Sequence, residues 1–352
     1  MNKIEVKSRN SSVELLKIIC IFGIISMHSF GRFYGTCQGI NLVYGNAINS
    51  LFNIGVSVFM LITGYYSTNF SINKIFNYEL IIIFYSILDL IVSAILKESV
   101  PIKVVLRSLF PIATRKYWYM SVYIIIVCLS DYLNMICEKL DRKHMRRLLL
   151  VLILFFYLMP SFLYFQIIED TGKGVVNMLI VYLIGRYIRT YHNESISPLK
   201  LFGQAILAFM ICFLGNLFFS LIAKQGEGLF CPWARDNSIF ILFGAIYIFL
   251  MFKNISFHSK LINSLAECIF ATYLLERTVR DIFDYFLDWS QFERSNMLAF
   301  IILLYVLFVM AICIGFESVR KCTIGKLENK IYTFFKNKYY LFHKKIEIMR
   351  RK

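Results

Sequence analysis

The stretch VELLKIICIFGIISMHSFGRF, residues 13–33, decides the class of this protein. It is long and apolar enough for a helix of about 20 residues that crosses a hydrocarbon core roughly 30 Å thick. No small-residue cleavage site follows it, so we expect a retained helix and not a signal peptide. It also contains Glu14, Lys17 and His28. Ionisable groups inside a span are costly, and they mark candidate functional residues.

The rest of the chain repeats this apolar pattern. Of its 352 residues, 58% are hydrophobic and only 17% are charged, whereas soluble domains average about 25% charged. The apolar runs are too long for barrel strands, so the spans should be helices. The sequence predicts an all-α polytopic transmembrane helical bundle of about ten helices. The expected spans are 13–33, 42–66, 75–96, 117–136, 147–165, 174–188, 199–223, 238–252, 261–276 and 297–315.

Charge distribution predicts the topology. An even number of spans puts both termini on one side, and positive residues favour cytoplasmic connectors. A cytoplasmic N-terminus places 25 Lys and Arg inside and 12 outside. We therefore expect both termini in the cytoplasm, a transmembrane domain over residues 1–317, and a basic amphipathic tail over 318–352 that contacts membrane lipids. One expected external connector, 97–116, is also basic, and its side chains either contact an anionic ligand or extend to the interface.

Two classes of function are disfavoured. The net charge of +16 fits cytoplasmic loops and anionic lipid, so we expect no nucleic-acid partner. The nine cysteines form no C-x-x-C pair and no His/Cys cluster with metal spacing, so no metal is expected. Cys37 and Cys231 both fall on the expected outer side, and the sequence does not decide whether they form a disulfide.

The first span has one polar stripe. Lys17 and His28 are eleven residues apart, about three turns and 16 Å, so they share a face. Glu14 lies at i,i+3 from Lys17 and can pair with it. Lys17 alone could be an interface anchor, and His28 alone a core histidine bonded to a neighbouring helix. A shared face makes a common role more attractive.

Four stretches in order carry a family resemblance. The first is Arg9 to Lys17 followed by ten residues and His28, and the second is GVSVFMLITGY at 55–65. The third is YWY at 117–119 with Tyr123, and the fourth is ATYLL at 271–275. Together they resemble the acyltransferase-3 family of membrane O-acyltransferases, across most of the chain.

The resemblance implies a function. Such proteins move an acyl group, commonly acetyl from acetyl-CoA, to a hydroxyl of a carbohydrate. Here the acceptor would be a cell-envelope polysaccharide or its lipid-linked precursor, and the location the bacterial cytoplasmic membrane. His28 would act as general base or take the acyl group itself, with Lys17 near the donor and Glu14 beside Lys17. The expected substrate-binding residues are Lys74, Trp118, Tyr119, Tyr123 and Glu276.

The chain also departs from the family pattern. Lys17 stands where Arg is usual, which keeps the charge and loses the bidentate fork. Ser29 replaces a second histidine, and Glu276 stands where many relatives have His. These departures leave the acceptor open.

Other classes stay as alternatives. The chain could be an envelope glycan transporter or flippase, although it shows no matched halves. It could be a glycan polymerase, although none of its expected external connectors is long. The residues alone also allow the tyrosines and Trp118 to form an interfacial aromatic belt.

Overall fold

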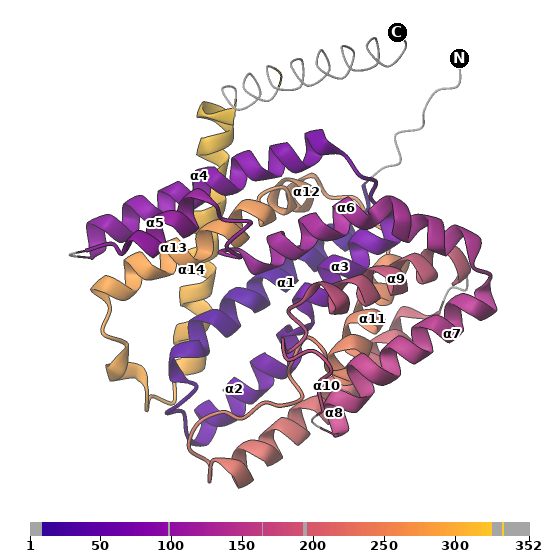
Figure 1. The fold of residues 1–352 in the computed structure, drawn as a ribbon. Helices are drawn as coiled ribbons and strands as arrows, with labels where there is room; N and C mark the ends of the chain where they lie inside the picture. The colour runs from indigo at the N-terminus through magenta and orange to yellow at the C-terminus, as the bar shows by residue number, and fades with distance from the viewer. Residues whose placement is uncertain (1–8, 98, 164, 193–195, 326–332, 334–352) are drawn as a thin grey trace.

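The computed structural model describes residues 9–97, 99–163, 165–192, 196–325 and 333, which form helices and no strand (Figure 1). The elements are α1 (Ser11–Phe30), η1 (Gly31–Phe33), α2 (Gly39–Phe52), α3 (Ile54–Tyr66), α4 (Ile72–Leu96), α5 (Ile102–Leu109), α6 (Trp118–Lys139), α7 (Arg142–Ile153), η2 (Leu154–Leu158), α8 (Met159–Phe162), α9 (Val175–Tyr191), α10 (Pro198–Ala223), α11 (Ile239–Asn254), α12 (Lys260–Ala266), α13 (Ile269–Phe286), η3 (Trp289–Phe292) and α14 (Leu298–Thr323).

In the part of the chain that the structure describes, each of the ten expected apolar segments is mostly helical, which confirms the predicted fold class. Seven helical stretches in the described residues are long and apolar enough to cross a membrane. They are Ser11–Phe33, Gly39–Tyr66, Ile72–Leu96, Trp118–Lys139, Arg142–Phe162, Pro198–Ala223 and Leu298–Thr323. The apolar helix α11 is shorter.

The ninth expected segment, 261–276, differs most from the structure. The chain turns at Glu267 and Cys268, and α13 then continues to Phe286. Residues 277–286, rich in charge, were expected in a connector. They remain helical because several of their charged side chains pair with other parts of the protein, as described below.

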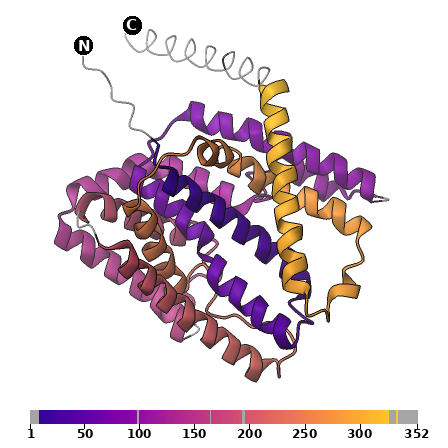
Figure 2. The ribbon, with the colours of Figure 1, turned by 180° about the vertical axis from the view of Figure 1, so that it is seen from behind.

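Helix α1 occupies the middle of the bundle. It packs against α2, α3, α11, α12, α13 and α14. Its apolar stretch is 67% buried, whereas that of α4 is 17% buried. Figure 2 shows α14, in yellow, crossing the outer side of the bundle. The ionisable groups of α1 therefore face protein and not lipid.

The apolar interior consists of two cores. One contains side chains from α3, α6, α9 and α11, and the other contains side chains from α1, α2, α4, α13 and α14. Phe59, Tyr119 and Tyr123 contact both cores. These aromatic side chains stand at the boundary, where the candidate site lies.

Connectors gather at the two ends of α1. Beyond its C-terminal end, the Leu229 N–H donates to Tyr34 O over 2.7 Å. At the opposite end, Arg9 pairs with Glu267 at 2.9 Å, and Lys321 donates to the Glu267 carbonyl at 3.2 Å. Both ends of the described chain therefore lie at one face. That this face is cytoplasmic stays a prediction.

Two further expectations concern the tail and the cysteines. Helix α14 runs through residue 317 to Thr323, and most of the predicted tail, 326–332 and 334–352, lies outside the described residues. Cys37 and Cys231 are both free thiols in the structure, and the Cys231 thiol lies 3.3 Å from Asn46 Oδ1.

The crossing of α3 and α9 generates a stability prediction. A Cβ added at Gly64 would overlap the backbone oxygen of Tyr182, whereas one added at Gly315 of α14 meets nothing within 4 Å. We expect Gly64→Ala to lower the free energy of unfolding by about 1–3 kcal/mol, because the helices must separate. Gly315→Ala should not destabilise the protein. Thermal unfolding in detergent measures both, and equal midpoints would contradict the predicted close contact.

Candidate active site

One large cavity follows α1 between the two cores. Its volume is about 940 Å³. Lys17, in the second turn of α1, and His28, in the last, both line it. Lys173 and Asp236, from the connectors beyond the C-terminal end of α1, line it as well. The cavity therefore runs alongside α1 over most of the length of this helix.

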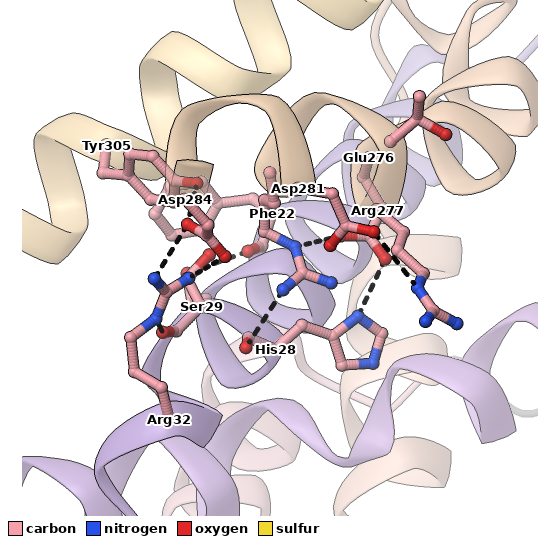
Figure 3. A network of polar contacts seen from close by, with 12 residues as sticks. Phe22, His28, Ser29, Arg32, Glu276, Arg277, Asp281, Asp284 and Tyr305 are labelled. Atoms are coloured by element: carbon pink, nitrogen blue, oxygen red, sulfur yellow. Dashed lines mark hydrogen bonds and ion pairs between the residues drawn. The ribbon is translucent and has the colours of Figure 1, made fainter. Parts of the chain in front are cut away.

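His28 is held by a carboxylate from α13. Its Nδ1 lies 3.0 Å from Glu276 Oε1, and Figure 3 shows the two side chains meeting across the gap between α1 and α13. The other carboxylate oxygen, Oε2, accepts a 2.6 Å hydrogen bond from Arg280 Nε. Arg280 also donates to the backbone oxygen of His28. The Glu276 carboxylate thus bridges a cation and the imidazole.

This arrangement defines which histidine nitrogen can react. A carboxylate accepts only, so Nδ1 carries the proton and Nε2 of the neutral ring keeps its lone pair. The His28 side chain is 47% exposed, whereas that of Glu276 is 6% exposed. The ring, which lines the cavity, is therefore accessible while its orienting partner is shielded. A histidine held this way can take a proton or act as a nucleophile.

A second ion pair fastens the end of α1 to α13. Arg32 donates two hydrogen bonds to Asp284, at 2.8 and 2.9 Å. The guanidinium lies 4.2 Å from the ring centre of Trp289, and Tyr305 also bonds Asp284. Figure 3 shows this group beside the His28 contact. Two parallel hydrogen bonds fix angle as well as distance, so the pair restrains the relative position of α1 and α13.

The polar start of α1 forms its own network. Lys17 Nζ lies 2.7 Å from Glu14 Oε2, as the i,i+3 spacing predicted. Arg9 contacts Glu14 Oε1 at 3.2 Å and reaches Glu267. Lys17 lines the cavity, whereas Glu14 does not. Lys17 is thus the only one of these four whose side chain is available to a ligand in the cavity.

Aromatic side chains form a wall of the cavity opposite α1. Trp118, Tyr119 and Tyr123, all predicted site residues, line it. Tyr119 packs on Tyr273 of α13 with ring centres 6.2 Å apart, and Tyr78 of α4 packs on Tyr123. The prediction from sequence brought the first three together and missed Tyr78 and Tyr273.

Lys74, predicted to bind substrate, does not line the cavity, and neither does Glu14, which was predicted to take part in catalysis. The Lys74 Nζ donates to Thr68 Oγ1 at 2.8 Å. A different lysine lines the cavity instead: Lys116 pairs with Asp89 at 2.8 Å, and Asp89 also accepts from Thr278 Oγ1. The sequence signal for Asp89 was an acidic residue deep in an apolar span, 75–96, whose other acidic residue is Glu79.

The largest omission from the sequence prediction is Arg280. The spacing Glu276-x-x-x-Arg280 places the two residues one turn apart on a helix. That signal was available, but the expected helix ended at Glu276. Among the described residues, no group of three or more His, Cys, Asp and Glu side chains is arranged to hold a metal ion.

Comparison with known proteins gives one match. A family model described as "Acyltransferase domain" matches residues 10–317. No curated protein and no solved structure matches the chain.

The buried Glu276 carboxylate yields a second stability prediction. Arg280→Leu leaves one of its oxygens without a cation, and breaking such a pair costs about 3–5 kcal/mol. Arg277→Leu is the matched control, because Arg277 is exposed and lies 3.8 Å from its partner Asp281. We expect its cost to be below about 1 kcal/mol. Unfolding midpoints of the two variants should differ clearly, and similar midpoints would argue against a buried, coupled Glu276.

Proposed function

The chain belongs to the acyltransferase-3 family, and from this premise we propose that it moves an acetyl group from acetyl-CoA to a hydroxyl of a cell-envelope polysaccharide or its lipid-linked precursor. Membrane acyltransferase activity follows from the family match over residues 10–317. The donor, the acceptor and a location in the bacterial cytoplasmic membrane are our proposal. The observation that carries it is the His28–Glu276 contact at 3.0 Å in the wall of a large cavity.

The site supplies what acyl transfer to a hydroxyl needs. A hydroxyl is a weak nucleophile at neutral pH and gains from a base placed beside it. In one route Nε2 of His28 takes the hydroxyl proton as the oxygen attacks the thioester carbonyl, the C–S bond breaks, and the proton passes to the CoA thiolate. In the other, Nε2 attacks the carbonyl first and CoA leaves as the thiolate; the acceptor hydroxyl oxygen then displaces the imidazole, and the hydroxyl proton passes to the CoA thiolate. Glu276 stabilises the positive imidazole ring in both.

The donor is proposed to approach from the Lys17 end of the cavity. Under the predicted topology this end faces the cytoplasm, where acetyl-CoA is made. Lys17 would contact the donor as a point charge. With the acyl group near His28, the nucleotide part of the donor would lie at a distance from the imidazole. Lys74 stays a prediction for binding that distant part.

The central prediction concerns His28. We expect His28→Ala to lower the rate of acetyl transfer by at least about 10²–10⁴-fold, because it removes the base or nucleophile, while insertion and accumulation stay normal. His144→Ala is a matched control. His144 also bonds a carboxylate, that of Asp141 at 2.9 Å, but it is 65% exposed on α7. Release of CoA thiol by purified protein measures both. Full activity in His28→Ala, or equal loss in both variants, contradicts the proposal.

Lys17 generates a separate prediction about the donor. We expect Lys17→Ala to raise the KM for acetyl-CoA about tenfold, the effect of losing one charge-assisted hydrogen bond. Lys17→Arg should restore most of the affinity. Lys139→Ala, at the end of α6, is the control for loss of a surface charge at the same predicted face. An unchanged KM for acetyl-CoA in Lys17→Ala would contradict a role of Lys17 in binding the donor.

A further inference from the structure

Asp236 is a buried carboxylate that no described residue satisfies. It lies in the connector between α10 and α11, lines the cavity, and is only 3% exposed. Its Oδ1 is buried and has no hydrogen-bond partner among the described residues. It likewise makes no ion pair within 4.0 Å in that part of the chain. Such a group is costly to bury.

The backbone around Asp236 is firmly held. The Asn177 amide donates to the Asp236 carbonyl at 3.3 Å and to the Gly172 carbonyl at 2.9 Å. Gly172 has φ of +85°, and a Cβ there would come within 2.4 Å of the Asn237 backbone nitrogen. The two connectors therefore touch backbone to backbone, and this contact fixes the backbone of Asp236 at the cavity wall.

Two neighbouring asparagines also have side-chain oxygens that are unpaired in the described part of the chain, but they line a different cavity. Asn177 Oδ1 and Asn237 Oδ1 also lack partners among the described residues. These two residues line a separate cavity of about 10 Å³, which is about the size of a single water molecule. Asp236 instead lines the 940 Å³ cavity that it shares with His28. Only Asp236 in this group faces a space that accommodates a substrate.

The charges nearby favour a neutral ligand. Burial raises the pKa of Asp236 to about 7, Lys173 opposes this rise and Asp170 adds to it. Lys173 and Arg235 line the same end of the cavity, so a cationic ligand would meet two positive side chains. Trp118 lies beside them, with its ring centre 6.0 Å from Lys173 Nζ. A carboxylate acceptor and a partly buried tryptophan ring that line the same cavity suit a sugar, whose hydroxyls donate and whose C–H face is apolar.

We propose that Asp236, with Trp118, forms the acceptor subsite and receives a hydrogen bond from a hydroxyl of the glycan. The identity of the ligand as a hydroxyl-bearing acceptor rests on the proposed function. The subsite lies beyond the C-terminal end of α1, away from Lys17. Donor and acceptor then reach His28 from different ends of one cavity.

Binding to the purified full-length protein tests the subsite directly. The probes are radiolabelled methyl glycosides of glucose, N-acetylglucosamine and rhamnose, measured by equilibrium dialysis. We expect Asp236→Asn and Asp236→Leu to weaken the best-bound glycoside about tenfold or more. Both variants should still be stabilised against heat by acetyl-CoA. Their melting temperatures should equal or exceed that of the parent, because a buried carboxylate without partners has been removed.

Asp170→Asn is the matched control. Asp170 lies in the neighbouring connector, and its Oδ1 is already satisfied by the Gly172 N–H at 2.8 Å, so we expect glycoside binding within twofold of the parent. Unchanged binding in Asp236→Asn, a lowered melting temperature in both Asp236 variants, or no glycoside binding to the parent would each overturn the subsite. Failure of the proposed function appears differently, as glycoside binding that depends on Asp236 without any acetyl transfer that depends on His28.

Discussion

The pairing of buried charge between α1 and α13 is the constraint on which the rest of the structure depends. Glu276 is 4% exposed, and a carboxylate buried so deeply needs partners on both oxygens. Arg280 satisfies one and His28 the other. Meeting this requirement places α13 against the last turn of α1 and holds the imidazole with its proton on Nδ1 and its lone pair on Nε2. The same contact that makes burial of Glu276 tolerable therefore prepares His28 for chemistry.

The rule extends to the walls of the cavity. In the cavity wall, Asp89 is paired with Lys116, and next to the His28 contact Asp284 is paired with Arg32, which lies 252 residues away in the sequence. These pairs lower the cost of keeping charged side chains inside a bundle whose exterior is apolar. Asp236 departs from this rule, because its Oδ1 has no hydrogen-bond partner among the described residues. The missing partner is the reason why we propose that Asp236 accepts a hydrogen bond from a ligand.

Local sequence information was enough for the helices but not for their partners. Long apolar runs specify helices in lipid whatever surrounds them, so each of the ten expected segments is mostly helical where the structure describes it, and the Lys17–His28 stripe correctly marked the cavity-lining face of α1. The end of α13 was mispredicted because residues 277–286 look like a polar connector until their partners are known. Glu276 was expected to contact substrate, and its bond to His28, 248 residues away, depends on tertiary packing that no local pattern encodes. The role of Asp236 depends on the absence of a partner, which only the folded structure reveals.

The orientation of His28 bears on how the two proposed routes compare. Because Glu276 occupies Nδ1, proton transfer and covalent transfer would both have to use Nε2. In the first route the carboxylate stabilises an imidazolium, and in the second an acyl-imidazolium of the same charge, so the protein environment favours neither strongly. What separates them is whether thioester and hydroxyl are present together beside Nε2. In the proposed arrangement, donor and acceptor reach His28 from opposite ends of the cavity and can be bound at once, which favours direct attack with His28 as the base.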